Sequence, residues 1–529
     1  MQKAIIAIDQ GTSSSRAVLF DLDFSIIHIE QININTKYPV NGWVEQDANE
    51  IWNKTLTVTK NIISFAKEKN IKVISIGITN QRETIIAWNK ITGKPLYNAI
   101  IWQDRRTKDI CDDLIKNGLT KTINTKTGLI IDPYFSATKI SWILDNIDNA
   151  KQLSLSGKLA VGTIETFLLF KLTEGKSFYT DATNASRTSL YNIHNNKWDN
   201  ELLDIFKIPI KVLAEVKDNI FDYGSTSKNI LGINVPINAM IGDQQAAAIG
   251  QNCINPGDIK ATFGTGCFIL LNTGDKALVS KNKLLSTIAY RINKSTSYAL
   301  EGSIFVSGAS MKWLKDELGI IKNVNDSQSL ASSIKDNNGV YFVPAFTGLG
   351  APHWKPDARG TIVGLTASSG KAEIVRAALE AVAYQSVDLF DAMAADGQKP
   401  IEVKVDGAMS NNDWLIQFLS NISKGDKRVF IINGKVFGAI SRVPKQGSFL
   451  SNMSKGAKPI NIKLTNKENK ISKLLARDLK KEKIFFAGVD FIDQKLNGDI
   501  NVTSPTGLKT LFDLSGINLA KIFWKELKV

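Results

Sequence analysis

The sequence predicts an α/β protein with two similar domains that face a cleft, followed by a shorter α+β segment. Strand-like and helix-like segments alternate over the first 250 residues, as in proteins whose helices cover a sheet. The pattern starts again near Asn252, where ATFGTGCF echoes the earlier stretch AIDQGTSS. Such an echo indicates an internal duplication. We therefore expect one domain over residues 1–248 and a second, incomplete domain over 249–423.

The elements of the first domain follow from local patterns. KAIIAID and RAVLFDLD flank a Gly-Thr-Ser turn and predict a hairpin. The spacing of apolar residues in ANEIWNKTLTVTKNIISFAKE predicts a helix. The β-branched run IKVISIGIT predicts a buried strand, and ETIIAWN predicts another.

The second domain repeats this arrangement. IKATFGTG and CFILLNTG predict two strands around a Gly-Thr turn. EIVRAALEAVAYQSVDLFDAM predicts a long amphipathic helix, and IEVKVDGAMSNN predicts a strand, a glycine turn and the start of a helix.

Composition narrows the functional classes. The net charge is +14, but the lysines are dispersed and form no stripe with aromatic residues, which argues against nucleic-acid binding. No apolar run is long enough to span a bilayer, and MQKAIIAIDQG reads as a first strand. The odd number of scattered cysteines fits a reducing cytoplasm: Cys111, Cys253 and Cys267. The histidines lack metal-ligand spacing: His28, His194 and His353. We expect a cytoplasmic protein with neither nucleic acid nor membrane as a partner, and a homo-oligomer stays open.

The turn in IDQGTSSSR is rich in hydroxyl groups. Thr12, Ser13 and Ser14 offer hydroxyl and amide donors, and Arg16 adds positive charge. Such a turn suits the outer phosphates of a nucleotide. Asp9 at the strand end could orient a hydrated magnesium ion. The alternative is an ordinary hairpin, and the pattern is not a P-loop.

Polar residues also follow the next predicted strands. Arg82, Glu83 and Tyr134 can supply the paired donors and acceptors that a neutral polyol needs, with Trp102 as an apolar wall. Each piece alone also fits a surface ion pair or a core aromatic residue. Asp243, beside Gln244, follows a strand and starts an Ala-rich helix. An aspartate there is a helix cap or a base aimed into a cleft, as phosphoryl transfer requires.

Taken in this order, the pieces resemble the glycerol-phosphorylating members of the FGGY carbohydrate kinase family, from Met1 to about Ser423. YFSATKISWILDN and GTIVGLTASSGKAEIVRAALE fit the two family signatures, and TNQRET and WQDRRT point to glycerol rather than to xylulose or gluconate. The resemblance implies two actin-like, ribonuclease-H-like domains around a cleft. It also implies ATP-dependent phosphorylation of glycerol to sn-glycerol 3-phosphate, with Mg²⁺.

The same resemblance implies the role of each site residue. Asp243 is the general base. The residues implied to bind glycerol through polar groups are Arg82, Glu83, Tyr134, Asp243 and Gln244. The two apolar walls are Trp102 and Phe268. The phosphates of ATP meet Thr12, Ser13, Ser14 and Arg16, with Asp9 near the metal. In the second domain the nucleotide contacts Thr265, Gly308, Gly407 and Asn411.

The sequence departs from the family at several places. VDGAMSNN is one glycine short of the usual adenine-binding turn, and the strand and TALGAA-type helix that should follow are not found. Lys312 stands where many relatives have Gln, and Glu165 where Asp is usual.

Residues 424–529 resemble a different family, the C-terminal end of the ATP-grasp domain of bacterial glutathione synthetases, through KGDKRVFIINGKVFGAISRVP and DINVTSPTG. This resemblance places Asp490, Asp499 and Asn501 at magnesium positions and two arginines on the substrate side: Arg428 and Arg442. The rest of that ligase is missing. A junction near Ser423, inside a domain, favours a truncated or artificially joined gene. The alternatives to an impaired kinase are an inactive chimera and a ligase fragment.

Overall fold

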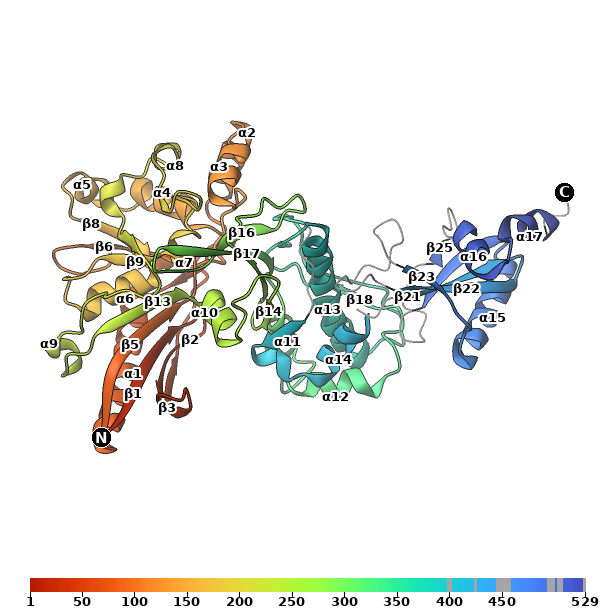
Figure 1. Cartoon of the computed structure of the whole chain (residues 1–529), viewed down its shortest axis with the longest axis horizontal. Helices are drawn as coiled ribbons and strands as arrows, with labels where there is room; N and C mark the ends of the chain where they lie inside the picture. The colour runs from red at the N-terminus through yellow and green to blue at the C-terminus, as the bar shows by residue number, and fades with distance from the viewer. Residues whose placement is uncertain (397–401, 423–425, 444–457, 492–499, 502–507, 527–529) are drawn as a thin grey trace. The chain divides into compact units, whose positions relative to one another are not determined.

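The computed structural model describes residues 1–396, 402–422, 426–443, 458–491, 500–501 and 508–526 (Figure 1). The chain forms two compact units. The first contains Met1–Lys260 and Phe268–Gly302, and the second contains Ala261–Cys267 and Ser303–Val529. Each unit is described by itself below.

The main sheet of the first unit has the strand order β13-β5-β1-β2-β3. These strands are β13 (Ile237–Gly242), β5 (Ile71–Asn80), β1 (Gln2–Gln10), β2 (Ser14–Phe20) and β3 (Ile26–Asn33). β1 and β2 pair antiparallel, which confirms the predicted hairpin. β5 pairs in parallel with both β1 and β13. The carboxyl ends of β1, β5 and β13 therefore meet at one edge, where Gln10 lies opposite Asn80 and Asn80 opposite Gly242.

The predicted first helix is α1 (Ala48–Glu68), capped by the Asp47 carboxylate on the amides of Asn49 and Glu50. The helix packs on β1, β2, β3 and β5. Every second residue of β1, namely Ala4, Ile6 and Ile8, is buried in the apolar core of this unit. A second sheet has the order β4-β7-β6-β8. Its strands are β4 (Glu45–Gln46), β7 (Ala99–Ile100), β6 (Ile85–Asn89) and β8 (Leu159–Thr163).

Short elements complete this unit. The helices are α2 (Lys108–Lys116), α3 (Thr120–Thr127), α4 (Ser136–Asn146), α5 (Ala150–Leu155), α6 (Ile164–Leu172), α7 (Ala182–Ala185), α8 (Asn200–Ile205), η1 (Ile210–Val212), α9 (Lys228–Leu231) and α10 (Asp243–Gly250). The short strands are β9 (Tyr179–Asp181), β10 (Tyr191–Asn192), β11 (Lys197–Trp198) and β12 (Glu215–Lys217).

A further sheet has the order β16-β17-β15-β14-β20. Its strands are β16 (Leu285–Ile292), β17 (Ser295–Ile304), β15 (Cys267–Gly274), β14 (Ile259–Phe263) and β20 (Val403–Asp406). The two Gly-Thr turns therefore belong to different sheets. The second unit adds α11 (Gly308–Asp316), α12 (Asp326–Ser333), β18 (Tyr341–Val343), β19 (Thr361–Val363), α13 (Lys371–Ala395), η2 (Ala408–Asn411) and α14 (Asp413–Ile422).

The C-terminal segment has its own sheet, β23-β22-β21-β24-β25. The strands are β21 (Asp426–Ile432), β22 (Lys435–Val443), β23 (Lys458–Asn461), β24 (Phe486–Phe491) and β25 (Ile500–Asn501), with helices α15 (Asn466–Lys481), α16 (Leu508–Ser515) and α17 (Leu519–Glu526).

Both faces of this C-terminal sheet are apolar. Val429 and Ile431 belong to a cluster that includes Leu479 of α15, and Phe430 belongs to another that includes Leu511. All members of the two clusters come from residues 429–523. The segment thus builds a core from its own side chains.

We predict that residues 424–529 fold cooperatively when expressed alone. Leu479→Ala removes a buried side chain of α15 and should lower the free energy of unfolding by about 2–5 kcal/mol. Leu474→Ala, on the same helix but 51% exposed, should change it by less than about 0.5 kcal/mol. Urea unfolding followed by circular dichroism measures both. Equal effects, or no cooperative transition in the unmodified segment, would contradict a self-contained core.

Candidate functional site

The candidate residues of the first unit gather where three parallel strands end. Asp9 is the penultimate residue of β1, Arg82 and Glu83 follow β5, and Asp243 follows β13. After β1 the chain turns at once, since the Gly11 amide donates to the Ser14 carbonyl at 3.0 Å. Thr12 and Ser14 are half-buried in this turn and Ser13 is exposed. Ligands of open α/β sheets bind at this kind of edge.

Asp243 is the first residue of α10 and keeps a side chain that is 31% exposed. Its Oδ1 accepts a hydrogen bond from the Gln244 amide at 2.7 Å. Just before it, the Gly242 amide donates to Thr183 Oγ1 at 2.9 Å, which fixes the turn that carries the carboxylate.

Burial and four nearby charged groups shift the pKa of Asp243. Burial raises the pKa of Asp243 to about 6, Glu83 and Asp9 add to the rise, and Arg82 and Lys260 oppose it. A carboxylate with this pKa is largely ionised at neutral pH and is a stronger base than an exposed aspartate.

Arg82 and Glu83 are both buried, so neither is the surface ion pair that the sequence left open. Arg82 donates from Nη1 and Nη2 to Glu301 at 2.6 and 3.0 Å. Glu83 Oε1 accepts from Arg187 Nε at 2.6 Å. The two candidate substrate residues are thus held by two charged residues that the sequence analysis did not single out.

The backbone of Glu83 is in the left-handed region, with φ of 58°, which is uncommon for a residue with a side chain. Its carbonyl accepts from Ser136 Oγ at 3.2 Å and from Lys139 Nζ at 3.4 Å. Lys139 also donates to the Tyr134 carbonyl at 2.7 Å, and burial lowers the pKa of Lys139 to about 8. One buried lysine therefore ties together the segments that carry Glu83 and Tyr134.

Trp102 and Phe268, the two residues predicted as apolar walls, pack against each other, and Tyr134 packs against Trp102. Trp102 lies edge-on to Phe268, with ring centroids 5.6 Å apart, and edge-on to Tyr134 at 6.0 Å. The indole Nε1 of Trp102 donates to Thr12 Oγ1 at 2.9 Å. The wall is therefore joined by a hydrogen bond to the hydroxyl-rich turn.

Asp9 is the first-unit candidate for magnesium. Arg16 Nη1 lies 3.9 Å from Asp9 Oδ2, and burial raises the pKa of Asp9 although Arg16 opposes the rise. One carboxylate beside a hydroxyl-rich turn fits a hydrated Mg²⁺ that is held mainly by phosphate oxygens. The described part of the chain contains no cluster of three His, Cys, Asp or Glu side chains that could hold a metal alone.

The metal positions suggested for the C-terminal segment are described only in part. Asp499 lies outside the described residues. The backbones of Asp490 and Asn501 belong to the paired strands β24 and β25. Of the two suggested arginines, Arg428 is buried in β21 and Arg442 lies in β22.

Three candidates of the second unit, Thr265, Gly308 and Gly407, lie in or against the Gly-Thr turn that follows β14. The Gly308 amide donates to the Gly264 carbonyl at 2.9 Å, and a Cβ on Gly308 would lie 2.7 Å from that oxygen. Gly407 has φ of 88°, and a Cβ there would lie 2.6 Å from the Phe263 carbonyl. Thr265 lies in this turn, and Asn411 ends the short helix η2 after Gly407. Both glycines are therefore required by close backbone packing.

Five residues that contact the candidate residues had no role predicted from the sequence: Arg187, Glu301, Lys139, Gln245 and Lys260. Lys260 is fully buried and donates to Gln244 Oε1 at 2.6 Å. Lys260 and Glu301 share one detectable signal, since each is a charged residue inside a run that reads as a buried strand.

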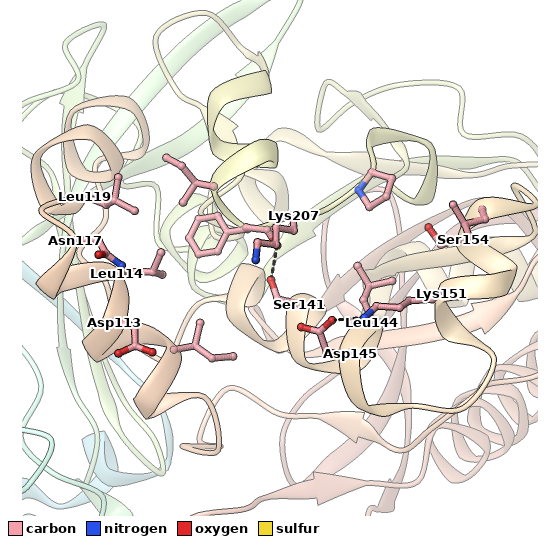
Figure 2. A pocket seen from close by; sticks show the side chains of 15 residues that line it. Asp113, Leu114, Asn117, Leu119, Ser141, Leu144, Asp145, Lys151, Ser154 and Lys207 are labelled. Atoms are coloured by element: carbon pink, nitrogen blue, oxygen red, sulfur yellow. Dashed lines mark hydrogen bonds and ion pairs between the residues drawn. The ribbon is translucent and has the colours of Figure 1, made fainter.

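A cavity of about 720 Å³ lies elsewhere in the first unit, among α2, α4, α5 and α8 (Figure 2). Its lining is mostly apolar, including Leu114 and Leu144, and Asp145 pairs with Lys151 beside it at 2.8 Å. None of the candidate residues lines this cavity.

The helices of the described residues include none that is long and apolar enough to cross a membrane.

Two domain families match the sequence. Residues 4–250 match the N-terminal domain and residues 259–440 the C-terminal domain of the FGGY family of carbohydrate kinases. Residues 371–516 match the ATP-grasp domain of prokaryotic glutathione synthetase. The C-terminal resemblance to that ligase is therefore also confirmed.

Relatives with known names agree with the larger match. The chain is 53% identical to a glycerol kinase of Coxiella burnetii over 423 residues, which are 80% of this chain and 84% of the relative. It is 53% identical to a glycerol kinase of Sinorhizobium fredii over 421 residues, which are 79% and 85% of the two chains.

Solved structures show the same fold. The structure of Plasmodium falciparum glycerol kinase with ADP is similar, with a TM-score of 0.73 and 38% identity over 80% of this chain and 85% of that chain. A xylulose kinase from Lactobacillus acidophilus shares the fold at 22% identity, with a TM-score of 0.69 over 91% of this chain and 97% of the other. With two matched domains and relatives at this identity and coverage, the chain belongs to the FGGY family of carbohydrate kinases.

Proposed function

We propose that this chain phosphorylates glycerol with ATP to form sn-glycerol 3-phosphate. The observation that carries the proposal is the position of Asp243 at a sheet edge that also holds the polar pair Arg82 and Glu83. The aromatic wall of Trp102 and Phe268 lies in the same unit. The relatives named as glycerol kinases support the choice of glycerol, and the ADP-bound structure of one supports a nucleotide.

In this proposal Asp243 takes the proton from the terminal hydroxyl of glycerol as that oxygen attacks the γ-phosphorus of ATP. The bond from the γ-phosphorus to the β,γ-bridging oxygen breaks, and ADP leaves with that oxygen. Arg82, Glu83, Tyr134 and Gln244 orient the other hydroxyl groups, and the apolar wall packs on the carbon chain. In-line positioning and charge neutralisation are most of what phosphoryl transfer needs from a protein.

We propose that, in the first unit, the amides and hydroxyls of Thr12, Ser13 and Ser14, with the Arg16 guanidinium, receive the phosphates of the nucleotide. In the second unit, Thr265, Gly308, Gly407 and Asn411 are the proposed contacts to the nucleotide. Asp9 would hold a hydrated Mg²⁺, which neutralises phosphate charge when bound.

We also propose that the chain works in the cytoplasm. Its three cysteines lie within the described residues, are buried and form no disulfide there, which fits a reducing compartment. Burial raises the pKa of the Cys111 thiol, so this group is an unreactive core residue.

We predict that Asp243→Asn lowers kcat for glycerol phosphorylation by roughly 10²-fold or more, because the amide cannot accept the proton. Glycerol binding measured by calorimetry should change much less. Asp23→Asn, at an exposed position of the same unit, is the control and should leave kcat unchanged. Near-normal turnover of Asp243→Asn in a coupled ADP-release assay would show that another group is the base.

The pH profile provides a second test. Protonated Asp243 cannot act as a base, and its pKa is raised to about 6. The value of kcat/KM should therefore be level above about pH 7, reach half of that level near pH 6, and fall tenfold per pH unit well below it. An acid limb near the ordinary aspartate pKa of about 4 would contradict this assignment.

Removing the C-terminal segment is a third test. Since its core uses only its own side chains, a chain cut after Ser423 should keep most of the glycerol kinase activity of the full chain. Replacing residues 424–529 with the C-terminal part of a glycerol kinase should raise both activity and Tm. If the cut alone abolishes a robust activity, the segment is an integral part of the site.

A further inference from the structure

We infer that Glu301 and Arg187 are positioning residues that hold the two charged polyol-binding side chains, Arg82 and Glu83, in their working orientation. The inference rests on the proposed function. It adds two residues that come from distant parts of the first unit, since Glu301 lies in β17 and Arg187 follows α7.

Glu301 determines which edge of the Arg82 guanidinium is available. Arginine has five N–H donors. Glu301 takes one from Nη1 at 2.6 Å and one from Nη2 at 3.0 Å, and Gln245 Oε1 takes the other from Nη1 at 3.1 Å. Nη2 also donates to the Tyr134 hydroxyl, with 3.5 Å between nitrogen and oxygen, so the Nε–H is the one donor that none of these hydrogen bonds uses.

The Nε of Arg82 faces the proposed base and Glu83. This nitrogen lies 3.5 Å from Asp243 Oδ1 and 3.8 Å from Glu83 Oε1, beyond good hydrogen-bond distance in both cases. Glu301 therefore holds Arg82 back from the proposed base. Without that anchor, the guanidinium would move toward the two carboxylates that remain, those of Asp243 and Glu83. It would then compete with the substrate for them.

Arg187 holds the Glu83 carboxylate in place by a hydrogen bond. Its Nε donates to Glu83 Oε1 at 2.6 Å, and its Nη2 donates to Glu301 Oε1 at 2.8 Å. The four charges alternate in sign along the series Glu83, Arg187, Glu301 and Arg82. Each of these side chains is at most 2% exposed, so their attraction is weakly screened by water.

The unpaired nitrogen of Arg187 supports a role in binding the two carboxylates rather than in filling the core. This nitrogen, Nη1, is buried and, among the described residues, has no hydrogen-bond partner. An orphaned buried donor destabilises the fold, so a residue that only filled the core would not need this group. The geometry is that of a bridge between two acidic groups.

The experiment compares Glu301→Gln with Glu380→Gln. Glu380 is also buried and paired, accepting from Arg376 Nε at 2.8 Å, but it lies in α13 of the second unit. Both changes remove a buried carboxylate charge, so both should lower Tm. We expect only Glu301→Gln to raise the KM for glycerol, by roughly tenfold or more, with the KM for ATP changed by less than about twofold.

The pH profile separates positioning from a loss of stability. The titratable and charged groups around Asp243 are Arg82, Glu83, Asp9 and Lys260. If Arg82 moves toward Asp243 in Glu301→Gln, the acid limb of kcat/KM shifts to lower pH, because a nearer cation favours the ionised carboxylate. A change in folded fraction alone would scale the profile without shifting it.

Three outcomes decide the matter. An unchanged glycerol KM and an unchanged acid limb in a folded Glu301→Gln would overturn the inference while leaving the proposed function intact. If the unmodified chain neither binds nor phosphorylates glycerol, the proposed function fails and the inference fails with it. Should Glu301→Gln not fold, Arg187→Lys, which keeps the charge but loses the fork, must raise the glycerol KM without affecting that for ATP, or the inference is wrong.

Discussion

The parallel pairing of β5 between β1 and β13 is the constraint on which the candidate site depends. It brings the ends of three strands, far apart in the sequence, to one edge, and residues from all three contribute there. The charges that collect at this edge would repel one another if they were not paired. The buried alternation of Glu83, Arg187, Glu301 and Arg82 balances them. Backbone topology places the residues, and electrostatic pairing sets their orientation.

The parts of this site that depend on local pattern were predictable. Arg82 and Glu83 follow a β-branched run, and Asp243 follows a segment that reads as a strand, so their place at a strand end could be read from neighbouring residues. The hairpin of β1 and β2 and the helix α1 were predictable for the same reason. The partners of those residues were not. The hydrogen bonds that Arg82 donates to Glu301 join residues 219 positions apart, and no local periodicity of the sequence encodes such a pairing. The hydrogen bond from Lys139 to the Glu83 carbonyl likewise joins residues 56 positions apart.

The two resemblances within one chain have a simple structural counterpart. Helix α14 ends at Ile422, and the next described strand, β21, already belongs to the C-terminal sheet. The FGGY match nevertheless runs to residue 440 and the ATP-grasp match begins at residue 371, so sequence similarity alone does not mark a sharp boundary. The apolar side-chain clusters mark the boundary better. All members of the two clusters of the C-terminal sheet lie after residue 428.

The two-sided apolar core of the C-terminal sheet affects how strand register is specified. Where one face of a sheet is polar, a slip by one residue exposes the core and is strongly disfavoured. In β21 both Val429 and Phe430 are buried, so such a slip would exchange one apolar face for the other. Register must then come from the turn. Asn433 and Gly434 have φ of 46° and 73°, as in the tight turns that join hairpin strands, and this pair is what keeps β21 and β22 in step.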